Sequence, residues 1–280
     1  MADESGVTVR VFLSHDVDWS RRGPGVDHVL ARRDRFDEEI LRRALEEGFN
    51  PYFGIPDVME VEERLGLRST FFFRSVYDDG LEVSCYEDVI RDLVSGGWEV
   101  GLHVVDASRA SAISREKRAL EEVSRSEVVG CRVHYLRVYE ETYESIRVAG
   151  LKYDSSLKAF KDRVDCADMG YEVVRGVVVF PITIMDAYLF TYMRVPEERV
   201  VEVVEEALDL AKRCGKDVVT ILWHDCSLRM RGGRMYHRIA EVLASREDVE
   251  VVRGVDLYKA VEATCSRDGW LAPRGWQKLC

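Results

Sequence analysis

The sequence predicts an α/β protein in which a mostly parallel sheet is closed, or nearly closed, into a barrel. Apolar strand-like runs alternate with amphipathic helix-like runs along the whole chain, and polar residues follow several of the strand-like runs. No shift in composition and no Pro-, Gly- or Ser-rich linker divides the 280 residues. We therefore expect residues 1–280 to form a single domain.

Seven runs have the length and the β-branched or aromatic content of buried strands. They span residues 8–14, 69–75, 98–103, 127–136, 173–182, 217–223 and 249–253. Between them, six segments place apolar residues at helical spacing and charged residues on the opposite face. These predicted helices span residues 37–47, 86–95, 113–123, 140–149, 197–213 and 234–246. The alternation favours a (β/α) barrel with about seven parallel strands.

The composition is that of an ordinary globular protein, and it limits the partners. Apolar residues make up 46% of the chain, so a sizeable core can be buried. The formal net charge of -11 argues against binding to nucleic acid or to an anionic membrane, because both depend on Lys and Arg to neutralise phosphates. We expect a small-molecule or oligosaccharide substrate instead.

The start of the chain, MADESGVTVR, lacks the basic and apolar regions of a signal peptide. Nowhere do about eighteen apolar residues follow one another, as a membrane-spanning helix would need. These features predict a cytoplasmic protein. Its 7 Cys are irregularly spaced and are expected to be mostly reduced core thiols, although intracellular proteins of thermophiles can carry a disulfide.

Polar residues fall at the carboxyl ends of the predicted strands, where parallel α/β folds place their ligands and their chemistry. The run VRVFLSHDVDWS, residues 9–20, ends a buried strand in an imidazole and two carboxylates. Burying such groups without partners costs several kcal/mol, so they must have hydrogen-bond partners, opposite charges or a bound ion. We expect them to converge with the polar residues of the other strands, namely Arg74, His103, Asp106, Arg132, His134, Asp186, His224 and Asp225.

Asp16 and Asp18 are two residues apart and would point to the same side of a regular strand. Two carboxylates in one cavity repel each other unless a cation lies between them. One Asp with two His is an open ligand set that suits zinc or a similar divalent ion and leaves a position for water. The second Asp could then accept a proton from that water as a general base.

Seven segments in this order resemble the motifs of the NodB-like polysaccharide deacetylases, particularly the branch whose first motif reads HDVD. They are FLSHDVDW, LRSTFFF, GWEVGLHVVDAS, CRVHYLRV, LKYDSSL, FPITIMD and ILWHD, and they run from about residue 9 to residue 225. The resemblance implies a distorted (β/α) barrel of fewer than eight repeats. It also implies metal-dependent removal of an acyl group from an amino sugar.

Carried over residue by residue, the resemblance implies that Asp16 is the catalytic base. Arg132 would pair with Asp16 and orient it, a task that suits a planar and permanently charged guanidinium. Asp18 and His103 would be metal ligands. These assignments come from the motifs, and the residue types agree with the metal chemistry inferred above.

The same resemblance implies that His224 is the general acid that protonates the leaving amine. The backbone N–H of Tyr135 would help to hold the oxyanion. Asp154 and Asp186 fall in motifs of this branch, and we expect them to support the pocket or its ligands. For His15, a supporting role and a purely structural, hydrogen-bonded histidine both stay open.

The sequence departs from the family pattern at the third metal ligand. Most members carry a second His four residues after the first, whereas Ala107 stands at that position here. We prefer His134 as the replacement, because it follows Arg132 by two residues and would face the same cavity from one strand. Asp106, three residues after His103, is the alternative.

We therefore expect a metal-dependent hydrolase of amide C–N bonds, with Zn²⁺ as the expected ion. An N-deacetylase acting on an amino sugar or on another carbohydrate-containing substrate is the leading hypothesis. Related NodB-like hydrolases open cyclic amides such as ureides, which gives one alternative. A non-catalytic carbohydrate-binding relative, inactive through loss of the second motif His, gives another.

Overall fold

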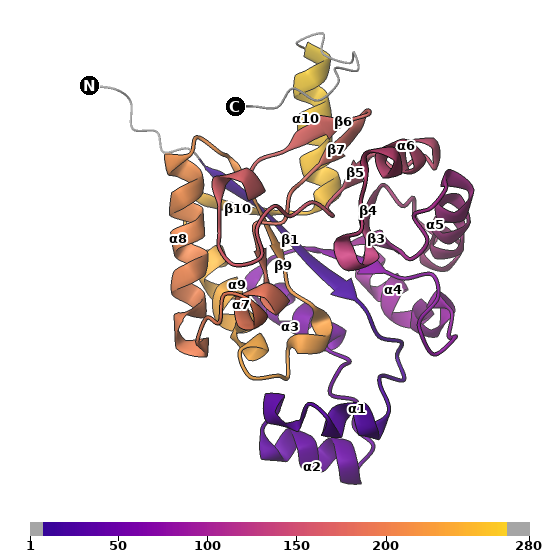
Figure 1. The fold of residues 1–280 in the computed structure, drawn as a ribbon, viewed down its shortest axis with the longest axis vertical. Helices are drawn as coiled ribbons and strands as arrows, with labels where there is room; N and C mark the ends of the chain where they lie inside the picture. Colours follow the sequence, from indigo (N-terminus) through magenta and orange to yellow (C-terminus); the bar gives the residue numbers. More distant parts are fainter. Residues whose placement is uncertain (1–7, 268–280) are drawn as a thin grey trace.

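Ten strands form one sheet in the computed structural model, which describes residues 8–267 (Figure 1). The strands are β1 (Val9–Val17), β2 (Thr70–Phe73), β3 (Glu99–Val104), β4 (Gly130–Val133), β5 (Tyr153–Asp154), β6 (Glu172–Val174), β7 (Val177–Val179), β8 (Ile184–Met185), β9 (Val218–Leu222) and β10 (Val249–Val252). Their order is β6-β7-β5-β4-β3-β2-β1-β9-β8, and β10 pairs with the first residues of β1. These pairings are parallel, apart from that of β6 with β7.

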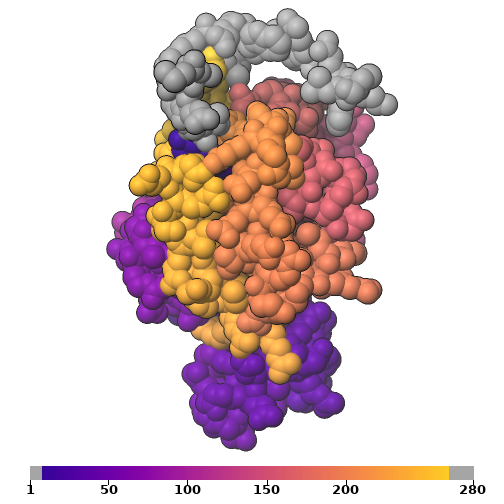
Figure 2. Space-filling view, turned by 90° about the vertical axis from the view of Figure 1, so that its left-hand side faces the viewer, coloured from indigo at the N-terminus to yellow at the C-terminus, as the bar shows by residue number. Residues whose placement is uncertain are grey.

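Helices surround this sheet. They are α1 (Val26–Leu30), α2 (Glu38–Glu46), α3 (Ile55–Leu65), α4 (Glu87–Ser95), α5 (Ala110–Ser124), α6 (Glu140–Val148), α7 (Asp186–Thr191), α8 (Val200–Arg213), α9 (Tyr236–Ser245) and α10 (Gly254–Arg267). Helices α1 and α2 project from the body at the end toward which β1 points (Figure 1, Figure 2). No helix within residues 8–267 is long and apolar enough to cross a bilayer.

One stretch of chain, residues 177–185, joins the two ends of the sheet. Its first part, β7, pairs with β5, and its last part, β8, pairs with β9. Between them, the Ile182 amide donates to the Leu157 carbonyl (2.8 Å) and the Thr183 amide donates to the Thr220 carbonyl (2.9 Å). This double attachment curls the sheet into a barrel, so the predicted distorted (β/α) barrel is confirmed.

The strand predicted over 173–182 is wrong in detail, because the chain reverses inside it. β6 and β7 form an antiparallel hairpin, and the turn between them consists of Arg175 and Gly176. Both turn residues have positive φ, 50° and 80°, as a tight hairpin turn requires. The Arg-Gly pair inside the apolar run VVRGVVV is therefore a turn, and only the part after it runs parallel to β5.

The other predicted strands correspond to β1, β2, β3, β4, β9 and β10, and the predicted helices to α2, α4, α5, α6, α8 and α9. β4 ends sooner than predicted, at Val133, where the short 3₁₀ turn η3 (His134–Leu136) begins. β5 and β8 have two residues each, which is too short to leave a periodic signal. Helix α3 was not predicted; it carries Pro56 in its first turn, where proline is tolerated.

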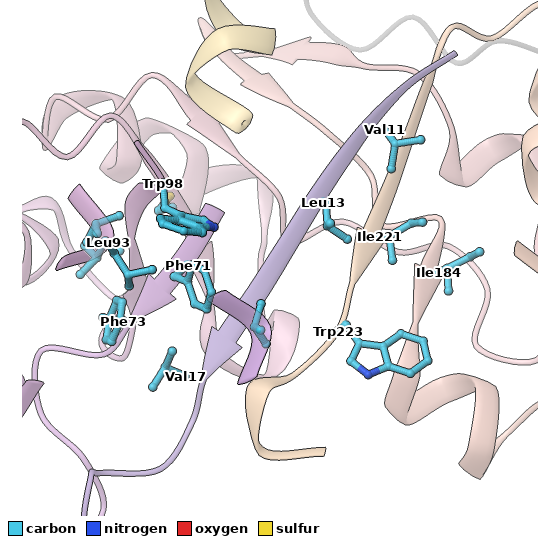
Figure 3. Packing of buried hydrophobic residues seen from close by; sticks show 14 of the residues in the cluster. Val11, Leu13, Val17, Phe71, Phe73, Leu93, Trp98, Ile184, Ile221 and Trp223 are labelled. Carbon is cyan, nitrogen blue, oxygen red and sulfur yellow. The ribbon is translucent and has the colours of Figure 1, made fainter. Parts of the chain in front are cut away.

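The side chains of β1 alternate between two environments, as the period of a strand requires. The odd-numbered positions face the helices, and Val11, Leu13 and Val17 pack there in the large core (Figure 3). Phe12 points to the other side, where it meets the rings of Phe72, Tyr153 and Phe180 inside the barrel. The even-numbered positions that follow Phe12 therefore lead along the barrel interior toward its carboxyl end.

The cysteines agree only in part with the expectation of reduced thiols. Cys85, Cys131 and Cys226 are free. Cys166 and Cys214 form a disulfide that ties the loop before β6 to the residue after α8. Cys265 and Cys280 lie outside the residues whose side chains are described.

Candidate active site

The predicted polar residues meet at the carboxyl end of the barrel because neighbouring parallel strands all end there. Asp16 lies in β1 and Asp18 follows it, His103 lies in β3, Arg132 lies in β4, and His224 follows β9 after one residue. His134 begins η3, directly after β4. The sheet order places β1 between β2 and β9 and places β3 beside β4, which brings these side chains into one cluster.

Arg132 is fully buried and fixes the carboxylate of Asp16. Its Nη1 donates to Asp16 Oδ1 at 2.8 Å, and its Nη2 donates to the hydroxyls of Ser14 (3.0 Å) and Ser155 (2.8 Å). Its Nε donates to the Ser155 carbonyl (2.6 Å), and its guanidinium lies 4.6 Å from the centre of the Phe72 ring. Because these contacts fix the guanidinium of Arg132, its hydrogen bond to Asp16 orients the Asp16 carboxylate.

Asp154 lies behind Arg132 and organises the turn that holds it. The Asp154 carboxylate accepts hydrogen bonds from the amide (2.9 Å) and the hydroxyl (2.5 Å) of Ser156. The same hydroxyl accepts from the Val133 amide at 2.7 Å, next to Arg132 in β4. Burial raises the pKa of Asp154 to about 6, against the lowering effect of these hydrogen bonds. Asp154 thus contacts the residues that hold Arg132, and its supporting role stays a prediction.

Asp18, His103 and His134 form a group that could hold a metal ion. Their ligand atoms all lie within 4.8 Å of one another. Asp18 Oδ1 is 3.2 Å from Nε2 of His103 and 3.6 Å from Nε2 of His134. The backbone carbonyl of Asp18 accepts a hydrogen bond from Arg74 at 3.2 Å, which fixes the position of this residue. The Asp18 side chain is 28% exposed, so the group is open to solvent.

The hydrogen bond on the far side of the His103 ring fits metal binding. His103 Nδ1 lies 2.9 Å from the Arg132 carbonyl, which can only accept, so Nδ1 carries the hydrogen. Although burial lowers the pKa of His103, Asp16 and Asp18 raise it above its usual value, so an ion at Nε2 would compete with a proton there. In the neutral ring this tautomer leaves Nε2 free to coordinate, which is the usual arrangement of metal-binding histidines. One carboxylate and two imidazoles are also donor types that zinc accepts in catalytic sites. The residues present therefore fit a divalent ion.

The charges in this group depend on one another. Burial alone would raise the pKa of Asp18, but the hydrogen bond with His103 and the nearby histidines hold it well below its usual value. Burial and the positive charge of His103 lower the pKa of His134 to about 4. The Asp18 side chain is therefore a carboxylate at neutral pH, and the His134 ring is neutral, as ligands must be.

Asp106, the alternative third ligand, lies outside this group. Its carboxylate accepts from the Ser108 amide at 3.0 Å, as in an Asx turn, and its own amide donates to Glu116 in α5 at 2.9 Å. These bonds hold the start of the loop after β3 against α5. Of the two candidates, the structure places His134 beside Asp18 and His103.

The His224 ring lies between two carboxylates, with its Nδ1 facing Asp186 and its Nε2 facing Asp18. Its Nδ1 is 2.6 Å from Asp186 Oδ1, and its amide donates to Asp186 Oδ2 at 3.1 Å. Ser227 donates to the same Oδ2 at 2.6 Å. Although burial lowers the pKa of His224, Asp186 outweighs it and raises the pKa to about 10. Its Nε2, 3.6 Å from Asp18 Oδ2, therefore carries a proton at neutral pH and can donate it.

Tyr135 follows His134 in an unusual backbone conformation. Its φ is 61° and that of Leu136 is 54°, a left-handed pair that is costly for residues with side chains and is found mainly at functional sites. The Tyr135 ring stacks on His134 with 3.9 Å between ring centres, and it is 68% exposed. Tyr135 therefore lies at the rim beside the candidate metal group.

His15 does not join the cluster, because its odd-numbered position in β1 turns its side chain toward the helices. Its ring contacts Glu62 of α3 and the Trp223 carbonyl. Sequence reasoning missed Glu62, whose position in an unpredicted helix gave no signal.

Asp225 lies at the rim, as expected, and has no role assigned from the sequence. Burial raises its pKa to about 8, and its Oδ1 is buried without a partner within the described residues.

No protein-family model matches the sequence, and no curated protein matches it. Solved structures with the same fold were found. A protein assigned as a polysaccharide deacetylase from Mycobacterium smegmatis is 19% identical, covering 99% of this chain and 96% of that one, with a TM-score of 0.67. A similarly assigned protein from Pseudomonas aeruginosa PAO1 is 17% identical over 94% of this chain and 93% of that one, with a TM-score of 0.61. An allantoinase is 16% identical over 93% and 92%, with a TM-score of 0.63.

At these identities the comparison establishes the fold. The chain has the fold of the polysaccharide deacetylases, in agreement with the resemblance of its ordered motifs. The match extends over nearly the full length of both chains.

Proposed function

We propose that this protein is a metal-dependent hydrolase of amide C–N bonds, and specifically an N-deacetylase of an amino sugar or another carbohydrate-containing substrate. One observation carries the proposal. Asp18, His103 and His134 form a group of metal-ligand type that contacts both a fixed carboxylate and a protonated imidazole: Asp16 lies 3.8 Å from His103, and His224 lies 3.6 Å from Asp18. Amide hydrolysis needs a base for water, stabilisation of an oxyanion and an acid for the amine, and this arrangement offers all three.

A divalent ion held by this group, with Zn²⁺ as the expected ion, would lower the pKa of water and polarise the amide carbonyl. Asp16 accepts the proton of the attacking water, in the orientation that Arg132 imposes. The water oxygen bonds to the acyl carbon, and the backbone N–H of Tyr135 helps to hold the developing oxyanion. His224 Nε2 then donates its proton to the nitrogen as the C–N bond breaks. The products are a carboxylate, acetate for an acetyl group, and a free amine.

A second candidate is the opening of a cyclic amide such as a ureide. It is supported by the similarity of the fold to that of an allantoinase. The same base and acid would serve, because opening a cyclic amide also breaks a C–N bond after attack by water. The two candidates differ in the substrate, so a substrate panel separates them.

The test is a panel assay of the purified protein supplied with Zn²⁺. Acetate release is measured from N-acetylglucosamine and N,N′-diacetylchitobiose, and ring opening is measured for allantoin and hydantoin. We expect acetate release that disappears in an Asp16→Asn variant, which keeps the metal ligands intact. Ring opening alone would favour the second candidate. A metal-loaded protein without activity on either class would contradict both and favour a non-catalytic carbohydrate-binding relative.

A further inference from the structure

A fully buried pair of ionisable residues lies on the outer face of β1, behind the candidate active site. The odd-numbered residues of this strand face the helices, and all of them are apolar except His15. The partner of His15 is Glu62 of α3, 3.0 Å away, and both side chains are 0% exposed. Apolar residues surround the pair, among them Phe71 and Trp223, which Figure 3 shows on either side of the strand.

Every polar atom of this pair has a partner. His15 Nδ1 lies 2.7 Å from the Trp223 carbonyl, which can only accept, so Nδ1 carries a hydrogen. His15 Nε2 faces Glu62 Oε1 at 3.0 Å, and the Tyr236 hydroxyl donates to the same oxygen. The other carboxylate oxygen accepts from Trp98 Nε1 at 2.6 Å. The network thus joins β1, α3, α9 and the end of β9.

Stability is a weak explanation for this network. A buried ion pair is often no more stabilising than apolar side chains of similar volume, and the other positions on this face of β1 are apolar. What the pair adds is geometry, because hydrogen bonds have a direction and apolar contacts do not. The carbonyl that His15 binds belongs to the residue directly before His224.

Trp223 is attached to β1 through both of its backbone polar groups. Its amide donates to the Ser14 carbonyl at 2.9 Å, and its carbonyl accepts from the His15 ring. The regular pairing of β1 with β9 ends one step earlier, at Ser14 and Leu222. His15 therefore extends the attachment of the two strands to the point where the chain turns toward His224.

We propose that His15 and Glu62 are positioning residues that set the place of the His224 imidazole relative to Asp16 and Asp18. The inference rests on the proposed function, in which His224 donates a proton to the leaving amine. Removing the network would let the Trp223 peptide move and would misplace His224, without touching any residue that contacts the substrate.

The decisive variant is the double substitution His15→Leu with Glu62→Leu, because it leaves no unpaired charge in the interior. Val11→Ala is the control: it creates a buried defect on the same face of β1, away from Trp223. On N,N′-diacetylchitobiose, we expect kcat of the double variant to fall on the order of 10- to 100-fold with an unchanged KM, as misplacement of a catalytic group does. The Val11→Ala variant should lose stability and keep its kcat.

A rescue experiment separates the geometric role from mere packing. His15→Asn in a Glu62→Gln background offers an amide N–H where His15 Nδ1 stands, so it can still donate to the Trp223 carbonyl. We expect this neutral polar pair to recover most of the lost kcat. A double Leu variant with wild-type kcat, or an Asn–Gln pair as slow as the Leu pair, would overturn the proposal.

A readout without turnover keeps this inference distinct from the proposed function. The Nδ1–H of His224, in its 2.6 Å contact with Asp186, should give a downfield imidazole signal in ¹H–¹⁵N NMR spectra. We expect the signal to move upfield in the double Leu variant and to stay in place in Val11→Ala. A protein inactive on every substrate would refute the proposed function, whereas an unmoved signal in the double variant would refute the positioning role.

Discussion

Replacing Asp186 by Asn tests the electrostatic part of the mechanism. Burial lowers the pKa of His224, but Asp186, with smaller contributions from Asp18 and Asp16, raises it from the usual 6.5 to about 10. Asn keeps an acceptor oxygen for the His224 amide but removes the negative charge. We expect the pKa of His224 to fall toward its usual value in the variant, because burial continues to lower it while the strongest raising partner is gone.

The size of the effect follows from the fraction of protonated acid. His224 must carry its proton to act, so activity is lost as pH rises through its pKa. At about pH 8, nearly all of His224 is protonated in the wild type, but with a pKa of 6.5 only about 3% would be, a loss of about 30-fold. The loss should shrink at lower pH, where both proteins keep the proton.

The assay is the pH dependence of kcat for acetate release, together with an NMR titration of His224. Ser227→Ala is the matched control, because Ser227 donates to the same carboxylate but leaves its charge in place. We expect the alkaline limb of the profile to shift to lower pH in Asp186→Asn and to move little in Ser227→Ala. An alkaline limb that coincides in Asp186→Asn and the wild type would refute the assignment of His224 as the acid.

Three further predictions concern the metal group, the base and a buried carboxyl group. His134→Ala should lower the affinity for Zn²⁺ strongly in titration calorimetry, as Asp18→Ala should, whereas Asp106→Ala should change it little; the reverse order would move the third ligand to Asp106. Asp16→Asn should abolish turnover by orders of magnitude while metal content, measured by elemental analysis, stays the same, and near-normal turnover would exclude Asp16 as the base. Asp225→Asn should stabilise the protein against urea above about pH 4. The folded pKa of Asp225 is raised from 3.8 to about 8, so the wild type loses stability as pH rises from 3.8 toward 8, and the variant is spared that loss. A difference in unfolding free energy between variant and wild type that is the same at pH 4 and at pH 8 would contradict this.

Much of the site could be predicted from the sequence because it depends on local periodicity at strand ends. Asp16 and Asp18 are two residues apart at the end of β1, and His134 follows Arg132 by two residues, so strand periodicity predicts one shared cavity. In the structure β4 ends at Val133, and η3 positions His134. The choice between His134 and Asp106 needed the structure. Glu116 of α5 accepts from the Asp106 amide and holds the start of the loop after β3, and the Asp106 carboxylate lies outside the candidate metal group. No sequence pattern near Asp106 predicts that contact.

The parts that could not be predicted depend on contacts between distant residues. His15 has the same neighbours in sequence as the site residues, yet its odd position in β1 sends it to Glu62, 47 residues away in a helix that was not predicted. The hairpin of β6 and β7 was missed because the apolar run continues on both sides of its turn at Arg175 and Gly176, and the antiparallel pairing reveals the reversal. The way residues 177–185 close the barrel likewise depends on pairings with two strands that are far apart in sequence.

The proposed mechanism requires a divalent ion bound by Asp18, His103 and His134. The most direct measurement is elemental analysis of the purified protein, combined with location of the ion by anomalous scattering in a crystal. We expect about one zinc-type ion per chain, with the carboxylate of Asp18 and both Nε2 atoms at about 2.0–2.2 Å from it. An ion bound elsewhere, or none bound after incubation with Zn²⁺, would contradict it.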